Sequence, residues 1–385
     1  MESLPKIVGV GDFKDFTELS STEHLELISV AGRIRDEELL NNGDLLFVRS
    51  NGNKDLIGRC MFFPEVRERL SFSGFTIRGR VINEAALPAY MAIVARSSQF
   101  QTQISKASGG TNISNLSQQI LNDINLLLPP LIEQKKIAQI LSTWDKAISV
   151  TEKLLTNSQQ QKKALMQQLL SGKKRLLDEN GVMFSGEWEV VRLKQLIHEE
   201  KKRNRDNHIQ RVLSVTNHSG FVLPEEQFSK RVASEDVSTY KIVKKNQYGY
   251  NPSRLNVGSF ARLDNYDEGV LSPMYVVFSI NHERLNSDYF LNWMSSNEAK
   301  QRIAGSTQGS VRDSVGFDAL CSFSFSLPTL MEQQKIAAVL SAADAEMSML
   351  EKKLACLKEE KKALMQQLLT GKRRVNVESE ETVSA

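Results

Sequence analysis

Residues Leu128–Arg175 read LPPLIEQKKIAQILSTWDKAISVTEKLLTNSQQQKKALMQQLLSGKKR, and residues Leu327–Arg374 read LPTLMEQQKIAAVLSAADAEMSMLEKKLACLKEEKKALMQQLLTGKRR. The second stretch follows the first at a constant offset of 199 residues, and the two are identical at 27 of 48 positions. An internal repeat of this kind indicates two equivalent modules in one chain. The repeat therefore decides the architecture.

Each repeat has the pattern of one long helix. It opens with Leu-Pro and closes with Gly-Lys, and proline is tolerated in a first helical turn whereas glycine commonly ends a helix. Roughly 39 helical residues would make a rod of about 58 Å. Apolar residues recur at alternating steps of four and three, which predicts a coiled-coil seam. The seam residues are Ile137, Leu141, Trp144, Ile148, Leu155, Leu165 and Leu169 in the first repeat, and Ile336, Leu340, Met347, Leu350, Leu354, Leu357, Leu364 and Leu368 in the second.

Polar residues interrupt both seams. Thr151, Ser158 and Lys162 do so in the first repeat and Lys361 in the second. Polar seam residues fix the register of a coiled coil at some cost in stability. We therefore expect the two helices to pair with each other in a defined register.

Composition limits the classes of protein that remain. With 385 residues, 41% hydrophobic and 25% charged, the chain is typical of a globular protein with two or three domains. Cys60, Cys321 and Cys356 have no paired spacing, so neither disulfides nor zinc are indicated, and we expect the reducing cytoplasm. No apolar run approaches a membrane span, and no signal peptide is recognisable.

Charge is unevenly distributed in the first module. Residues 1–48 contain four Lys/Arg against ten Asp/Glu, whereas residues 49–106 contain nine against four. A local basic patch can neutralise nucleic-acid phosphates, although clustered charge more often marks a solvated surface.

The segments before the repeats are mixed and rich in short alternating strands. In the first we expect strands near 6–10, 44–49 and 72–80 and a helix over 87–106. In the second we expect strands near 211–216, 240–250 and 270–280 and a helix over 287–303. The predicted fold is α+β, with two β-rich mixed domains, each followed by a long helix. The predicted division is 1–127 first domain, 128–175 first helix, 176–187 linker, 188–326 second domain, 327–374 second helix and 375–385 disordered tail.

The chain resembles the specificity subunits of type I restriction–modification systems. The resemblance rests on Leu-Pro-x-Leu-x-Glu-Gln-x-x-Ile-Ala at Leu128–Ala138 and Leu327–Ala337, each preceded by a variable domain, and it covers nearly the whole chain. It implies that each variable domain is a target recognition domain that reads half of a bipartite DNA sequence, and that the helices pair antiparallel. It also implies as partners double-stranded DNA, two modification (methyltransferase) subunits and restriction (endonuclease and translocase) subunits, with S-adenosylmethionine, ATP and Mg²⁺ bound only by those subunits. Apolar residues off the seam are candidates for the subunit contact: Leu131, Ile132, Leu154, Leu330 and Met331.

One feature departs from the family pattern. The second domain opens with Glu187–Leu193, EWEVVRL, and about twenty further residues before Val212, whereas the first begins almost at once with Lys6-Ile7-Val8. We therefore expect the first domain to lack its N-terminal segment.

The candidate DNA contacts are loop residues of the types that read bases or hold phosphates. Arg and Lys suit guanine, Asn and Gln suit adenine, and the loops recur at equivalent places in both domains, although any single residue could belong to an ordinary surface turn. Lys201, Lys202 and Arg203 are expected to contact phosphates or only solvent. The other candidates are Arg49, Asn51, Asn53, Lys54, Arg59, Thr111 and Asn112 in the first domain, and Tyr250, Asn251, Arg254, Asn256, Gln308, Ser310 and Arg312 in the second.

No motif indicates catalysis. The sequence has no Asn/Asp-Pro-Pro-aromatic methyltransferase motif, no complete P-loop and no histidine spacing typical of a metal site or a catalytic triad. The expected function is non-catalytic DNA recognition and scaffolding, with no cofactor or metal bound by this chain. Two alternatives stay open: a coiled-coil adaptor with one non-functional DNA-binding domain, and an enzyme with an unrecognised active site.

Overall fold

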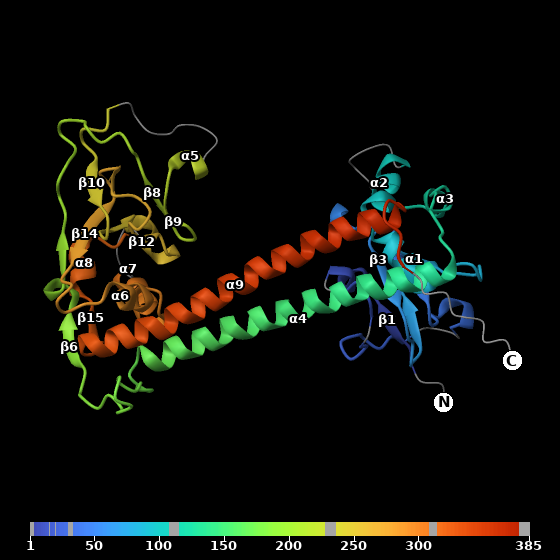
Figure 1. The fold of residues 1–385 in the computed structure, drawn as a ribbon, viewed down its shortest axis with the longest axis horizontal. Coiled ribbons are helices and arrows are strands. Elements are labelled where there is room, and N and C mark those ends of the chain that lie inside the picture. The colour runs from blue at the N-terminus through green and yellow to red at the C-terminus, as the bar shows by residue number, and fades with distance from the viewer. Residues whose placement is uncertain are drawn as a thin grey trace. The chain divides into compact units, whose positions relative to one another are not determined.

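The computed structural model describes residues 4–14, 16–19, 21–29, 34–107, 115–227, 236–307 and 314–376. The chain forms two compact units (Figure 1). Unit 1 comprises Met1–Glu152 and Lys352–Ala385, and unit 2 comprises Lys153–Glu351. This division differs from the linear one that the sequence suggests, because each unit contains the first half of one long helix and the second half of the other.

The two repeats form the long helices α4 (Leu131–Leu169) and α9 (Leu330–Leu369). Within each unit the beginning of one helix packs against the end of the other, so the pairing is antiparallel. Two equivalent ion pairs mark its register: Lys361 with Asp145 in unit 1, and Lys162 with Asp344 in unit 2. The polar interruptions at Lys162 and Lys361 therefore each have a carboxylate partner on the opposite helix.

Unit 1 contains a three-stranded antiparallel sheet in the order β3-β2-β5 and a parallel pair β1-β4. Three helices, α1, α2 and α3, connect this sheet to α4. The bounds are β1 (Lys6–Val8), β2 (Asp44–Val48), β3 (Cys60–Phe63), β4 (Leu70–Phe72), β5 (Thr76–Gly79), α1 (Pro88–Ala95), α2 (Ser98–Ala107) and α3 (Gln118–Asn122), with short 3₁₀ helices η1 (Val10–Lys14), η2 (Asp36–Glu38) and η3 (Lys54–Leu56).

Unit 2 repeats this plan with additional strands. Its main sheet has four strands in the order β12-β11-β14-β7, and three further pairs are β10-β13, β8-β9 and β15-β6. The bounds are β6 (Glu189–Arg192), η4 (Leu193–Gln195), β7 (Ile197–Glu199), β8 (Ser214–Thr216), β9 (Gly220–Val222), α5 (Pro224–Gln227), β10 (Lys241–Lys244), β11 (Tyr248–Tyr250), η5 (Pro252–Val257), β12 (Phe260–Arg262), β13 (Glu268–Leu271), β14 (Val276–Ile280), α6 (Ser287–Met294), α7 (Asn297–Thr307), α8 (Phe317–Ser322) and β15 (Ser324–Leu327).

Several expected elements are shorter than the sequence suggested. The strands expected over 72–80, 240–250 and 270–280 are each broken by a turn, and the helices expected over 87–106 and 287–303 each divide into two. A serine stands at each helix break, where its side chain competes for main-chain groups. The Ser97 hydroxyl accepts a hydrogen bond from Phe100 N, and that of Ser296 accepts one from Ala299 N, both at 3.2 Å.

Each domain core includes the ends of both long helices. In unit 1, Ile137 and Leu141 of α4 lie in one cluster with Leu368 and Leu369 of α9 and the apolar face of the sheet. In unit 2, the equivalent cluster joins the end of α4 to Ile336 and Leu340 of α9, as well as to the aromatic residues Tyr248, Phe278, Phe290 and Trp293. Nearer the middle of the helices the seam residues are only half-buried, because two helices alone cannot enclose them.

Candidate nucleic-acid interface

The loop after β2 presents the first group of candidate residues in unit 1. The side-chain Oδ1 of Asn51 accepts a hydrogen bond from Asn53 N at 2.7 Å, and Oδ1 of Asn53 accepts one from Asp55 N at 3.1 Å. These bonds hold the loop in a tight turn that leads into η3. The Arg49 side chain is exposed, and no ion pair joins it to another described residue. The side chain of Lys54 lies outside the described part of the chain.

Unit 2 builds an equivalent loop after β11. Asn251 caps η5, because its side-chain oxygen accepts a hydrogen bond from Ser253 N at 3.0 Å. η5 ends at Gly258, whose φ of 88° is a conformation that favours glycine. Arg254 and Asn256 are exposed on this helix, and the described residues offer their side chains no hydrogen bond or ion pair. Their donors are therefore available to a ligand.

In both units the loop is tied to the segment that precedes α3 or α8. Leu116 N donates to Arg49 O at 2.7 Å, and Val315 N donates to Pro252 O at 3.0 Å. The two donors are separated by the repeat offset of 199 residues, and each acceptor lies in the loop after the central strand. In each unit the contact joins the first loop to a residue that follows the second predicted loop in the sequence. The candidates on the second loops, Thr111, Asn112, Gln308, Ser310 and Arg312, lie outside the described residues.

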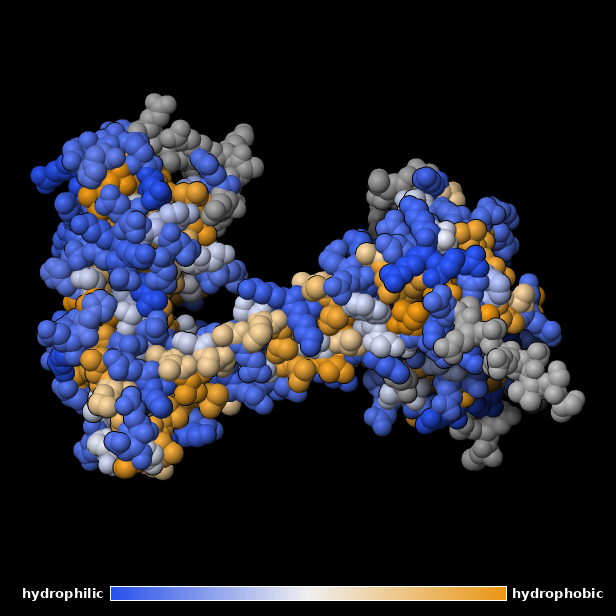
Figure 2. All heavy atoms as spheres, viewed as in Figure 1, coloured by the Kyte–Doolittle hydropathy of each residue, from blue (hydrophilic) through white to orange (hydrophobic). Residues whose placement is uncertain are grey.

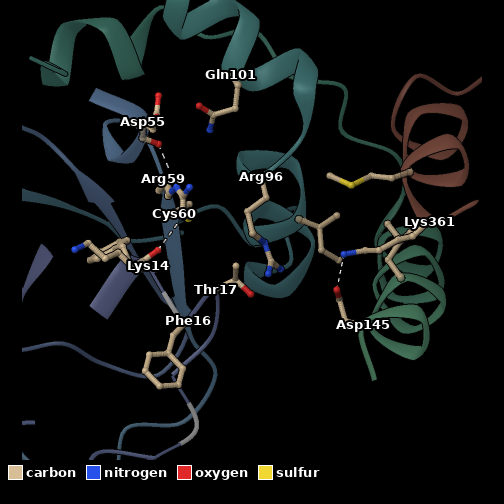
Figure 3. Close-up of a pocket in the computed structure, with 14 residues that line it drawn as sticks. Lys14, Phe16, Thr17, Asp55, Arg59, Cys60, Arg96, Gln101, Asp145 and Lys361 are labelled. Carbon is tan, nitrogen blue, oxygen red and sulfur yellow. Dashed lines mark hydrogen bonds and ion pairs between the residues drawn. The ribbon is translucent and has the colours of Figure 1, made fainter. Parts of the chain in front are cut away.

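Two candidates make contacts within their own unit that the sequence did not indicate. Tyr250 was wrongly included, because its side chain is fully buried in the aromatic core and burial raises the pKa of its phenol. Arg59 donates to the main-chain oxygens of Asp55 and Phe13, and it lines a cavity of about 470 Å³ together with Arg96 (Figure 3). The Arg59 guanidinium therefore joins η3 to η1 within unit 1.

The basic run after β7 is exposed. Lys201 pairs with Glu199 at 3.0 Å, and the same carboxylate lies 4.0 Å from Lys241. Burial lowers the pKa of Lys241, and the neighbouring positive charges act in the same direction. Lys202 and Arg203 have exposed side chains. This strip suits electrostatic attraction of phosphates better than base reading, because one carboxylate already partly neutralises it.

The sequence did not reveal the roles of the Glu and Gln that both repeats of this chain share. Gln134 is fully buried, and its amide nitrogen donates to Pro129 O and Ala85 O, both at 2.7 Å. Its oxygen accepts from Leu87 N at 2.8 Å. These three hydrogen bonds, called the glutamine clamp below, fix the start of α4 to the segment that leads into α1.

Gln333 forms the same clamp in unit 2. It donates to Pro328 O and Arg284 O at 2.9 Å and accepts from Asn286 N at 2.8 Å. All partners of Gln333 are those of Gln134 shifted by 199 residues. The only sequence signal for the clamp was that the same Gln occurs in both repeats. The hydrogen-bond partners of its side chain are main-chain atoms, which no sequence pattern identifies.

The Glu that precedes this Gln in each repeat pairs with the Arg at the end of the other repeat. Glu332 accepts hydrogen bonds from Arg175 at 2.6 and 2.8 Å, and Glu133 accepts them from Arg374, one at 2.8 Å. In unit 2, Trp188 covers this pair: its indole nitrogen donates to Glu332 at 3.0 Å, and its ring lies 5.5 Å from the Arg175 guanidinium. These bidentate pairs join the beginning of one helix to the residues after the other.

Several apolar side chains remain exposed along the helices. Figure 2 shows hydrophobic residues on the surface of α4 and α9. Four of the five proposed subunit contacts belong to this set, and Leu330 is half-buried. The exposed apolar residues of the helices are Leu131, Ile132, Val150, Leu154, Met331 and Met349.

The described residues contain no group of three or more His, Cys, Asp or Glu side chains that could hold a metal ion. Among these same residues no helix is long and apolar enough to cross a membrane. The three cysteines are free, and burial raises the pKa of the Cys60 thiol to about 12.

Comparisons with known proteins agree with this architecture. The chain matches the family described as "Type I restriction modification DNA specificity domain" over residues 32–157 and 185–359. It is 24% identical to the type I restriction enzyme MjaVIII specificity subunit of Methanocaldococcus jannaschii, over 92% of this chain and 85% of that protein. It is 26% identical to the putative MjaX specificity subunit of the same organism, over 97% and 87%.

Two solved structures share the fold. A chain from a study of complex assembly and conformational transition of the type I R-M system aligns with a TM-score of 0.57 at 15% identity, covering 96% of this chain and 92% of that one. The type I restriction–modification S subunit of M. genitalium aligns with a TM-score of 0.56 at 11% identity, covering 95% and 88%. The fold class expected from the sequence, with two long helices that pack together, is thus confirmed.

The family match covers most of the chain, and the repeated loops lie in both of its matched regions. The chain therefore belongs to the type I restriction–modification DNA specificity family. It is a specificity subunit with two DNA specificity domains, the arrangement expected for recognition of a bipartite target.

Proposed function

We propose that the paired loops of each unit read one block of the DNA target. The observation that carries this proposal is the duplicated geometry, in which a capped or tightly turned loop after a central strand is hydrogen-bonded to the segment before α3 or α8. The loop residues differ between units while the supporting contacts are the same. One scaffold with two different reading loops is what recognition of two different sequences requires.

We propose that the chain acts together with two modification subunits and with restriction subunits, in the cytoplasm. The exposed apolar residues of α4 and α9 support a subunit contact, because several recur at equivalent positions, such as Val150 and Met349. S-adenosylmethionine, ATP and Mg²⁺ would then belong to the partner subunits. Free cysteines fit a reducing compartment.

The chain itself is proposed to be non-catalytic. Its described residues supply neither a metal-binding cluster nor a cysteine with a lowered pKa. Purified chain alone should therefore neither methylate nor cleave DNA, nor hydrolyse ATP, when assayed with radiolabelled S-adenosylmethionine, plasmid DNA and ATP. Turnover that co-purifies with the chain through successive columns would contradict this.

The reading role is tested with substitutions that leave the loop fold intact. Asn251→Asp keeps the oxygen that caps η5 but removes the amide donor, and Arg254→Ala removes an exposed side chain without a partner in the described structure. Both changes should relax the specificity of one target block, with a loss of about 1–3 kcal/mol per good base contact. The measurement is the methylated sequence, mapped genome-wide with the assembled methyltransferase.

Two controls separate base reading from phosphate binding. Arg49→Ala in unit 1 should alter the other target block and leave the first unchanged. Lys201→Ala with Lys202→Ala should weaken binding to all DNA sequences and reduce the salt dependence of binding. With fewer phosphates neutralised, binding releases fewer counterions from the DNA. The loop assignment is wrong if Arg254→Ala lowers methylation equally at every site without changing the sequence that is methylated.

A further inference from the structure

One turn in each unit carries an exposed apolar side chain at its tip. In unit 1 the turn joins β4 to β5, and the Phe75 at its tip is 63% exposed. In unit 2 the turn joins β13 to β14, and the Met274 at its tip is 64% exposed. The two residues are separated by 199 positions, which is the repeat offset. A large exposed apolar side chain therefore recurs at the same place in both copies.

The two turns have the same main-chain hydrogen bond. Thr76 N donates to Ser73 O in unit 1, and Tyr275 N donates to Ser272 O in unit 2, both at 3.0 Å. Each bond closes a four-residue turn in which the exposed apolar residue is the third. In unit 1 the Ser73 hydroxyl also accepts a hydrogen bond from the N–H of the apolar residue at 3.2 Å. The position of each tip is therefore fixed by the turn that carries it.

In unit 1 this turn is joined directly to the loop after β2. Arg49 N donates to Phe75 O at 2.8 Å, and Ser50 N approaches the same oxygen at 3.3 Å. The carbonyl oxygen of Arg49 accepts the bond from Leu116 N that joins the segment before α3. The apolar tip, the loop and that segment therefore meet at Arg49.

In unit 2 the strand register places the turn beside the loop after β11. Tyr250 pairs with Val276 in the antiparallel ladder of β11 and β14. The residues that follow Tyr250 and those that precede Val276 therefore lie at the same end of the sheet. Asn251, which caps η5, and Met274 are among these residues. Both units thus place an apolar tip next to hydrogen-bonding loop residues.

Single exposed apolar side chains are common on proteins and by themselves have no functional meaning. These two differ because the apolar character recurs although the surrounding sequence does not. Residues 71–77 read SFSGFTI and residues 270–276 read VLSPMYV, and only one Ser is identical in the two. The polar residues of the neighbouring loops also differ between the units. The shared apolar tip therefore suits a contact that does not depend on which bases the unit reads.

We propose that Phe75 and Met274 are apolar wedges, each of which enters between two neighbouring base pairs of the DNA block that its unit reads. Phe and Met are among the side chains that enter base steps and partly unstack them. Such a side chain forms no hydrogen bond with a base, so it favours a step that unstacks easily, such as a pyrimidine–purine step. The proposal rests on the assignment of the loops after β2 and β11 as the reading site, and it adds indirect recognition to that site.

The first test measures the affinity of the assembled methyltransferase for duplexes that contain its mapped target. Phe75→Ala and Met274→Ala should each weaken binding roughly tenfold in a fluorescence anisotropy titration. Phe75→Leu and Met274→Leu should retain most of the affinity, because leucine can also act as a wedge. Ile82→Ala in unit 1 and Val182→Ala in unit 2 are matched controls, since both side chains are exposed but lie outside the reading loops. These two variants should bind as the unchanged chain does.

The second test distinguishes a wedge from another apolar contact. A nick that keeps its 5′-phosphate makes one base step easier to unstack without changing a base. When the nick is moved stepwise through the target, binding of the unchanged chain should become stronger at one step in each block. Phe75→Ala should remove that preference in one block only, and Met274→Ala should remove it in the other block only.

The possible failures can be told apart. Unchanged DNA affinity of Phe75→Ala and Met274→Ala would overturn the wedges, and the reading loops would stand if Arg49→Ala and Arg254→Ala still changed the methylated sequence. If none of these four variants changed DNA binding or the methylated sequence, the reading site itself would be wrong. A loss that disappears when one thymine is replaced by uracil would mean a contact with the thymine methyl group in place of a wedge. Weaker assembly with the modification subunits at unchanged DNA affinity would mean that the tips contact protein.

Discussion

The two ends of the helix pair contain the same Arg–Glu contact in different surroundings. In unit 2 the pair lies beneath Trp188 and next to β6, and the Glu332 side chain is 1% exposed. In unit 1 Arg374 is mostly solvated, although the Glu133 side chain is 9% exposed. Identical residues at identical spacing therefore have different energetic weight, because the loss of water around an ion pair determines the cost of breaking it.

The glutamine clamps provide the opposite case. Gln134 and Gln333 are both fully buried and make the same three hydrogen bonds to equivalent main-chain atoms. Residues 188–199, the covering segment of unit 2 that includes Trp188 and β6, supply none of these hydrogen-bond partners of Gln333. The comparison thus separates contacts that depend on the cover from contacts that each repeat makes by itself.

The largest expected effect is the loss of a clamp. Gln333→Leu keeps the side-chain size but leaves two carbonyls and one N–H buried without a partner, which should cost on the order of 4 kcal/mol. Gln134→Leu should cost a similar amount in unit 1. Chemical denaturation followed by circular dichroism measures both.

Gln→Glu variants at the same positions serve as matched controls, since they retain the acceptor oxygen and remove the two donated bonds. If the loss in the free energy of unfolding for one of Gln134→Leu and Gln333→Leu were less than half the loss for the other, the covering segment would also support the clamp. That result would remove the distinction drawn between the two kinds of contact.

A smaller and asymmetric effect is expected for the ion pairs. Arg175→Ala leaves Glu332 buried without its partner and should cost on the order of 3 kcal/mol. Arg374→Ala should cost clearly less, because solvent reaches Arg374 and screens the charge. The free energy of unfolding of the two single variants, measured under the same conditions, gives the ratio directly.

The dependence of stability on acidic pH provides a second measurement of the Arg374–Glu133 pair in unit 1. Hydrogen bonds from Arg374 lower the pKa of Glu133 below its ordinary 4.5. A carboxyl with a lowered folded-state pKa stabilises the fold above its ordinary pKa, and this contribution is lost as the pH falls through the folded-state value. Arg374→Ala should therefore flatten the stability profile below about pH 4.5. Equal losses for Arg175→Ala and Arg374→Ala would show that cover does not determine the strength of the pair.

The repeat made the long helices predictable, because heptad spacing and terminal Pro and Gly are local signals, whereas their antiparallel pairing was implied only by the family resemblance. The pairing of residues 324–327 with β6 was not predictable, since it joins segments far apart in the sequence. The two helix breaks at Ser97 and Ser296 were missed because the apolar pattern continues through them.

The candidate site was predictable only at the level of loops. The places of the two loops, each after a predicted strand, could be read from the sequence, but the burial of Tyr250 could not. A tyrosine beside a reading loop has the same sequence signature whether it faces the solvent or the core. The hydrogen bonds of Arg59 were not predictable either, because its partners are the main-chain oxygens of Asp55 and Phe13, which carry no side-chain signal.

The smallest expected effect concerns the register of the helix pair. Lys361–Asp145 in unit 1 and Lys162–Asp344 in unit 2 occupy equivalent positions, and their side chains are partly exposed to similar extents: 23% and 45% in the first pair, 19% and 49% in the second. Neither pair lies under the covering segment, so each should contribute below about 1 kcal/mol in a double-mutant cycle, and the two values should agree. Exchanging the charges in one pair, with Lys361→Asp and Asp145→Lys together, should restore most of the loss caused by Lys361→Asp alone. A large coupling energy in unit 2 only would mean that the ends of the helix pair differ along the helices themselves, and not merely where Trp188 and β6 cover one of them.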